Sequence, residues 1–266
     1  MNIFLEEIRS NKRITIIWAL ALAIGSIAFL SMFPAFTKDV TATQKILENF
    51  PKALRDALGL SLKDFFSVYG FYAYLFTFMT LGGAIQAMNL GIGALSREES
   101  GKTVDFLLTK PVNRNKIITN KLLANLVLLI LTNIIFGFVA LITAKIVTSG
   151  EFVPKTFMLI TLTMFFIQLF FLALGMLFSV IMPKIKSVIS VTLPTVFTFF
   201  IIGTLGAIIG NDKVKFISPF KFFDSAYIIS HGNYEVKYLI IDFVFVFITI
   251  LLSYMIYNKK DIRAVS

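Results

Sequence analysis

The sequence predicts an all-α membrane protein with six transmembrane helices, and three observations support this. Of its 266 residues, 57% are apolar and only 15% charged, with a mean hydropathy of +0.85, whereas soluble domains carry about 25% charged residues. Five runs of 23 to 32 residues contain no Asp, Glu, Lys or Arg. Because about 20 apolar residues cross the hydrocarbon core as a helix, each run can span it once. The runs are continuous rather than alternating, which indicates helices and not strands.

The first span follows a short basic segment. The charge-free run Ile14–Thr37 is preceded by Arg9, Lys12 and Arg13. It is longer than the apolar stretch of a signal peptide, and no small-residue cleavage motif follows it, so we expect a retained helix. Residues 3–9 mix apolar and charged side chains. This mixture predicts a short amphipathic helix on the inner membrane surface that leads into the first span.

The other charge-free runs are 65–96, 122–144, 156–183 and 187–211, and a sixth candidate, 238–258, contains a single charge at Asp242. Within one membrane domain covering 1–266, we place the spans at about 14–36, 70–95, 122–144, 157–182, 188–210 and 238–257. Two pairs of small residues four apart, Ala21 with Gly25 and Gly206 with Gly210, are suited to close contact between helices.

The distribution of basic residues predicts that both termini are cytoplasmic. With the N-terminus inside, the inner segments, which include loops 96–121 and 183–186, carry 14 Lys and Arg, against 11 in the longer outer segments. On the outer side, 43–60 has helical apolar spacing and predicts an amphipathic interfacial helix, interrupted or restarted at Pro51. The aromatic residues within 213–238 are expected at headgroup depth.

Several function classes are excluded or disfavoured by what remains outside the spans. No loop or tail is longer than about 28 residues, so no soluble catalytic domain fits. The chain has no cysteine and one histidine, His231, which excludes thiolate and multi-histidine metal sites. Gly101-Lys102-Thr103 is similar to the end of a phosphate-binding loop, but the earlier glycine is missing. The net charge is +10, but the basic residues flank apolar spans. This placement fits a role in membrane topology and contact with lipid headgroups better than binding of nucleic acid. We therefore expect no enzyme activity in this chain.

The loop 96–121 is the most informative segment. Thr103–Leu108 follows a glycine, has an apolar face and precedes Lys110-Pro111, which predicts a short helix that ends before the proline. A short amphipathic helix between two spans suits docking into a groove of a soluble partner. The pattern consists of Glu98 or Glu99, Gly101, Thr103, Leu107-Leu108, Pro111-Val112, Arg114 and Lys121.

This pattern resembles the loop between the second and third spans in permease subunits of type-2 ABC transporters. These are six-helix, exporter-type membrane subunits, as in bacitracin-resistance and nitrous oxide reductase maturation systems. Two shorter segments, 218–224 and 260–262, add to the resemblance, which covers essentially the whole chain. One departure is Lys102, since many relatives have adjacent Gly and Thr.

The resemblance implies a mechanism by coupling to a separate ATP-binding subunit. In that family this loop holds a coupling helix that contacts the ATPase, which binds the ATP and Mg²⁺; this chain itself carries no cofactor. The family also implies a dimer, with itself or a related permease, in a prokaryotic plasma membrane. The resemblance assigns the coupling role to Glu98, Glu99, Gly101, Thr103, Leu107, Leu108, Pro111 and Arg114.

Six polar residues inside the predicted spans are candidates for lining a translocation pathway: Gln86, Asn89, Asn125, Asn133, Gln168 and Asp242. Hydrogen bonding between helices is the favoured explanation for the amides. For Asp242, which lies five residues after Lys237, a shallow structural role is favoured over a contact with a substrate or ion. Two other function classes stay open at this point, namely an ion-coupled secondary transporter and a non-transporting membrane scaffold or sensor. The substrate is not identified by the sequence; an amphipathic peptide, a lipid-like molecule or a drug fits the Phe-rich spans.

Overall fold

The computed structural model describes residues 2–57, 60, 62, 64–100, 113–148, 152–182, 185–210, 214 and 216–259. Within these ranges all regular structure is helical, and six helical segments are long and apolar enough to cross a membrane. The chain is thus a multi-pass, all-α membrane protein, as predicted. The long helices are α1 (Ile3–Leu30), α5 (Val68–Ser100), α7 (Arg114–Val147), α8 (Pro154–Ile181), α9 (Val188–Ile209) and α11 (Val236–Lys259).

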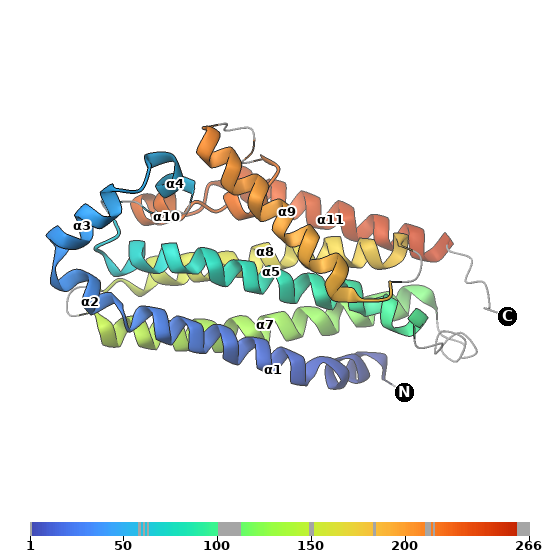
Figure 1. Cartoon of the computed structure of the whole chain (residues 1–266). Coiled ribbons are helices and arrows are strands. Elements are labelled where there is room, and N and C mark those ends of the chain that lie inside the picture. Colours follow the sequence, from blue (N-terminus) through green and yellow to red (C-terminus); the bar gives the residue numbers. More distant parts are fainter. Residues whose placement is uncertain are drawn as a thin grey trace.

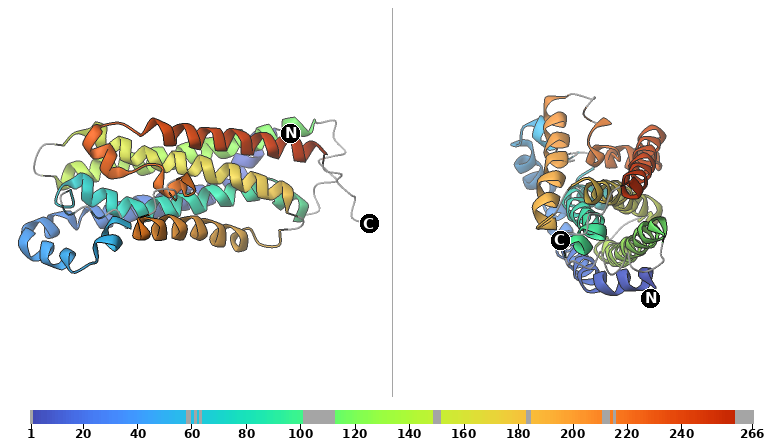
Figure 2. Two further views of the ribbon diagram at one scale, coloured as in Figure 1. Left: turned by 90° about the horizontal axis from the view of Figure 1, so that it is seen from above. Right: turned by 90° about the vertical axis from the view of Figure 1, so that its right-hand side faces the viewer.

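The long helices α1, α5, α7, α8 and α11 run lengthwise through one bundle, and α9 crosses it obliquely (Figure 1). The centre is formed by α5 and α8; α1 lies along α7, α11 packs on α8, and α9 packs on α5. The start of α1 and the end of α11 lie at the same end of the bundle, together with the end of α5 and the start of α7 (Figure 2). We refer to this as the inner end, following the orientation predicted from the charges.

The closest approach in the core is between α5 and α8. A Cβ atom added to Gly91 would lie 2.4 Å from the carbonyl oxygen of Leu172, and one added to Gly175 would lie 2.8 Å from that of Met88. Both contacts are to backbone, so only glycine allows the two helices to pack this closely. Of the small residues singled out in the sequence, Gly25 meets only the flexible end of Met79, while Gly206 packs on Val214 of the loop after α9.

Short helices cover the outer end of the bundle. They are α2 (Phe33–Lys38), α3 (Val40–Glu48) and α4 (Lys52–Ala57). The break between α3 and α4 lies just before Pro51, as predicted. Asp39 starts α3, and the hydrogen bonds that its carboxylate accepts, first from the Ala42 amide and then from the Thr41 hydroxyl, lower its pKa. The separate inner surface helix expected over 3–9 is absent, because these residues form the first turns of α1.

The segment between α9 and α11 turns back into the bundle. It contains a 3₁₀ turn, η2 (Pro219–Lys221), and α10 (Ser225–His231). The Ser218 hydroxyl donates to the carbonyl of Phe199, near the middle of α9, at 2.8 Å. The Phe220 ring lies 5.5 Å from Phe171, which is well inside α8. This segment, from 214 to 224, is termed the re-entrant segment below (Figure 2).

The expectation that the aromatic residues of 213–238 lie at headgroup depth was therefore wrong for Phe222 and Phe223, whereas Phe216 is exposed. Phe222 and Phe223 are buried, with 3% and 8% of their surface exposed. Non-helical backbone at membrane depth is tolerated only where protein covers it or where it lines a water-filled cavity. Here the rings of α8 and the backbone of α9 provide that cover.

Candidate functional site

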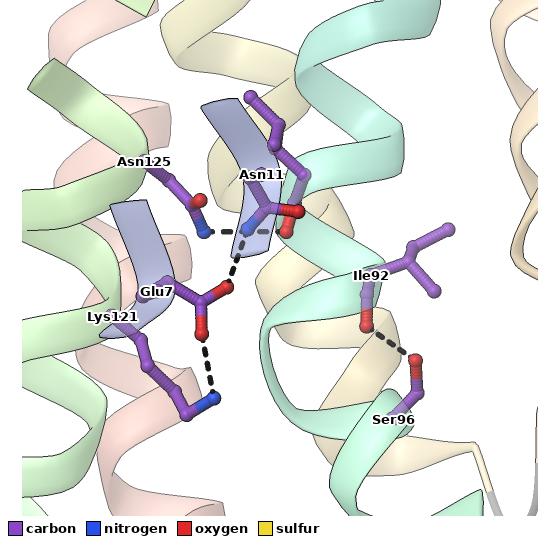
Figure 3. Close-up of polar contacts among 7 residues, drawn as sticks. Glu7, Asn11, Ile92, Ser96, Lys121 and Asn125 are labelled. Carbon is purple, nitrogen blue, oxygen red and sulfur yellow. Dashed lines mark hydrogen bonds and ion pairs between the residues drawn. The ribbon is translucent and has the colours of Figure 1, made fainter. Parts of the chain in front are cut away.

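A buried ion pair lies at the inner end of the bundle (Figure 3). The Lys121 ammonium of α7 donates to the Glu7 carboxylate of α1 at 2.9 Å, and the two side chains are 3% and 11% exposed. Asn11, one turn after Glu7, donates to the other carboxylate oxygen at 2.8 Å. Because an unpaired charge is costly when buried, the Glu7 carboxylate depends on these two donors. The pair therefore fixes the start of α1 against α7.

One turn further along α7, Asn125 connects this helix to α5. Its side-chain amide donates to the carbonyl of Leu90 at 3.3 Å, and its own oxygen is buried without a hydrogen-bond partner among the described residues. Near the end of α5, the Ser96 hydroxyl donates a hydrogen bond to the carbonyl of Ile92 at 2.6 Å (Figure 3). Lys121 and Asn125 thus place bonds to α1 and α5 on consecutive turns of α7.

The first turns of α7 also hold the end of α11. Asn113 caps α7 by accepting from the Asn115 amide. The Arg114 guanidinium donates to the carbonyls of Tyr257 and Asn258 at 3.3 and 3.2 Å. A cation is favourable at these carbonyls because they are the negative end of a helix dipole. Thr119 and Tyr254 share a hydrogen bond between hydroxyls at 2.7 Å.

These contacts describe what we call the inner clamp: Glu7 and Asn11 of α1, Arg114, Thr119 and Lys121 of α7, and Tyr254, Tyr257 and Asn258 of α11. The clamp directly follows the loop that the sequence singled out. A displacement of the start of α7 would be transmitted to α1 through an ion pair and to α11 through several hydrogen bonds.

Most of the predicted coupling residues lie outside the described residues. This holds for Gly101, Thr103, Leu107, Leu108 and Pro111, so the helix expected over Thr103–Leu108 stays a prediction. Glu98 and Glu99 belong to the last turn of α5, where only the backbone is described. Arg114 is described, and the bonds it makes are to α11 within the same chain.

A second polar cluster lies deep in the bundle and joins three helices. Gln86 of α5 donates to the Thr132 hydroxyl of α7 at 2.8 Å. Gln168 of α8 donates to Gln86 at 3.3 Å and accepts from Asn133 of α7. Both glutamines are almost completely buried. Three of the six pathway candidates therefore meet in one network that holds α5, α7 and α8 together.

The remaining pathway candidates are not in that network. Asn89 accepts from the Thr192 hydroxyl of α9 at 2.8 Å, and Asn125 bonds α5 as described above. Asp242 of α11 is fully buried. In this conformation the five amides act between helices, and their role in transport stays a prediction.

The sequence reasoning missed Glu7, Asn11 and Lys121 as partners. The sequence places Lys121 in the loop motif that carries the family resemblance, without a partner, and Glu7 in a surface helix. The spacing of four between Glu7 and Asn11 places them on one helix face, which was the only local signal. The ion pair itself joins residues 114 positions apart, so no short-range pattern indicates it.

Comparison with known proteins gives one family. The model of the family described as ABC-2 family transporter protein matches residues 1–262. None of the curated proteins compared with the chain matches it.

Proposed function

The chain belongs to the ABC-2 family of transporter proteins, and on that premise we propose that it is the membrane half of an ATP-driven exporter that couples to a separate ATP-binding subunit through its loop 96–121. As a permease it is a transport component rather than an enzyme. The ATP and Mg²⁺ would be held by the partner. A dimer, with itself or a related permease, would enclose the pathway between two such bundles.

The inner clamp is the observation that carries this proposal. The loop connects α5 to α7, and the first turns of α7 are bonded to α1 and α11. Asn125 adds a bond from α7 back to α5. Force applied to the loop therefore acts on four of the six spans through short polar contacts. A loop that served only to set topology would not need these contacts, of which the Glu7–Lys121 ion pair is buried.

The proposed mechanism follows from these contacts. Closure of two ATP-bound subunits would displace the loop, and the clamp would carry α1 and α11 along with α7. A nucleotide can shift the membrane helices only if the closed ATPase binds one arrangement of the loop more tightly than another. The clamp supplies the connection through which a change in the arrangement of the loop changes the arrangement of the spans.

The proposal predicts that acidic residues at Leu107 and Leu108 uncouple the ATPase. Buried leucines are typical anchors of a helix in a groove, and carboxylates there would have to be desolvated. The Leu107→Asp, Leu108→Asp variant should insert and fold as the wild type does, but retain less than a tenth of the ATPase activity that co-purifies with the wild-type chain. Membrane fractionation, melting of the detergent-purified chain and vanadate-sensitive ATP hydrolysis measure these outcomes.

A matched control makes the same chemical change at the outer end. Ile46 and Phe50 are exposed apolar residues at α3 and just beyond it, and Ile46→Asp with Phe50→Asp should leave the co-purifying ATPase unchanged. Equal ATPase recovery with the loop variant and the wild type would rule out the proposed docking. No vanadate-sensitive hydrolysis with either chain would favour the secondary transporter or the scaffold.

A further inference from the structure

Asp242 is a buried carboxyl group with no partner in the described part of the chain. It is 0% exposed, and neither of its oxygens has a hydrogen-bond partner there. A buried carboxylate is strongly disfavoured unless it is paired. Unsatisfied buried groups of this kind call for an explanation, and a bound species is one of the common ones.

The surroundings of Asp242 on α11 are aromatic. One turn before it on the same helix face, the Tyr238 ring stacks on Phe222 of the re-entrant segment with centroids 6.0 Å apart. About one turn after it, the Phe245 ring stacks on Phe170 of α8 at 3.9 Å. The turns of α11 on both sides of the carboxyl group are thus covered by rings from two other elements.

The rings that cover α11 on the two sides of Asp242 come from α8, a transmembrane helix, and from the re-entrant segment, which is not one. It supplies Phe222, which packs on Phe170 of α8 as well as on Tyr238. Its backbone is held in the bundle by the bond from Ser218 to α9. This short segment, rather than a transmembrane helix, therefore supplies the ring that stacks on Tyr238, one turn before Asp242.

The chemistry of this cluster favours a particular class of ligand. A carboxylate supplies charge, and ring faces attract cations, most strongly where water is excluded. Ca²⁺ and Mg²⁺ take six or more oxygen ligands, whereas the rings on either side of Asp242 offer none beyond the Tyr238 hydroxyl. An organic cation, with its charge spread under apolar substituents, satisfies both the carboxylate and the rings.

We propose that Asp242, with Tyr238, Phe245, Phe170 and Phe222, forms a binding site for a lipophilic organic cation, such as an ammonium or phosphonium ion with apolar substituents. This assignment names the substrate class and rests on the proposed transport function. The site is closed in this conformation and takes up the cation when the re-entrant segment moves.

Binding of radiolabelled tetraphenylphosphonium to the full chain in lipid nanodiscs tests the site without any ATPase. The wild type should bind it saturably above the empty-nanodisc background. Asp242→Asn keeps the shape but removes the charge, and should weaken binding by about tenfold or more. Asp39→Asn is the matched control, because Asp39 caps the short helix α3 at an exposed position outside the re-entrant segment, and it should bind as the wild type does.

Two further measurements keep the proposal falsifiable if Asp242→Asn melts early. Phe170→Leu should weaken binding about two- to fivefold through loss of a ring face. Tetraphenylborate, which has the same shape and the opposite charge, should show no saturable binding. The proposal is overturned if the wild type binds no phosphonium, if the borate binds as tightly, or if both variants bind like the wild type. Each of these outcomes leaves the co-purification of an ATPase untouched, so the two proposals fail separately.

Discussion

Replacing Gly91 by alanine is expected to destabilise the bundle by about 2–4 kcal/mol and lower its apparent melting temperature by roughly 5–15 °C. The added Cβ atom would lie 2.4 Å from the carbonyl oxygen of Leu172 and 2.9 Å from the amide nitrogen of Met176. Both atoms are backbone of α8, so no side-chain rotation relieves the overlap. The two central helices must move apart, which weakens every contact between them.

Gly137 provides the matched control on α7. A Cβ atom there would lie 3.5 Å from the Thr161 methyl group, an ordinary contact. Because alanine favours a helix over glycine by up to about 1 kcal/mol, Gly137→Ala should leave the melting temperature unchanged or slightly raised. Melting of the detergent-purified chain, followed through its only tryptophan, Trp18, compares the two. Equal melting of both variants would show that α5 and α8 are not packed backbone to backbone.

The second large effect is expected at the inner clamp. Lys121→Met leaves the Glu7 carboxylate buried with only Asn11 to bond it, and we expect a loss of about 3 kcal/mol. Glu7→Gln combined with Lys121→Met removes both charges of the pair, and should recover part of that stability because the Glu7 carboxylate is no longer left buried without Lys121. The measurement is a double-mutant cycle on unfolding of the purified chain, with a coupling energy of about 1–3 kcal/mol expected.

Lys116 tests whether the effect belongs to the pair or to any lysine of α7. It is exposed, and Lys116→Met should change stability by no more than about 0.5 kcal/mol. Strictly additive effects of Glu7→Gln and Lys121→Met would contradict the ion pair. If the clamp transmits force from the loop, the Lys121→Met variant should also hydrolyse ATP with less transport per ATP in the assembled complex, whereas Lys116→Met should not.

The transmembrane part of the fold could be predicted from sequence because lipid imposes a simple rule. A run without charges that is long enough must be a helix that satisfies its own backbone. The break of the outer helix before Pro51 follows from similarly local chemistry, since proline cannot continue a helix. These features depend on neighbours in sequence.

The errors arise where distant residues decide the outcome. Residues 3–9 have an amphipathic sequence, but Glu7 forms an ion pair with Lys121 and the segment is part of α1. The aromatic residues after α9 have a composition typical of the membrane interface, yet the Phe222 ring packs on Phe170 and Tyr238 inside the bundle. The closest helix contact uses Gly91 and Gly175 from different helices, a pairing that spacing within one helix cannot indicate.

The position of the candidate site along the chain could be predicted from the sequence, but the residues that its side chains contact could not. The loop 96–121 stands out in composition, and Arg114 was named with it. That Arg114 bonds the end of α11, and that Lys121 anchors α1, depends on how α7 lies between these two helices. A tertiary arrangement of this kind leaves no trace in the spacing of residues along the chain.

A single introduced cysteine tests the central claim most directly. The chain has no cysteine, so Leu108→Cys is unique and can be labelled with a membrane-impermeant maleimide that carries a photoreactive group, which on illumination joins it to a partner without needing a cysteine there. In inside-out vesicles the account predicts a cross-linked product that contains an ABC-type ATP-binding subunit, with a yield that changes on addition of ATP and vanadate. Reaction of this cysteine only from the opposite membrane face, or a product without any ATP-binding subunit, would contradict it.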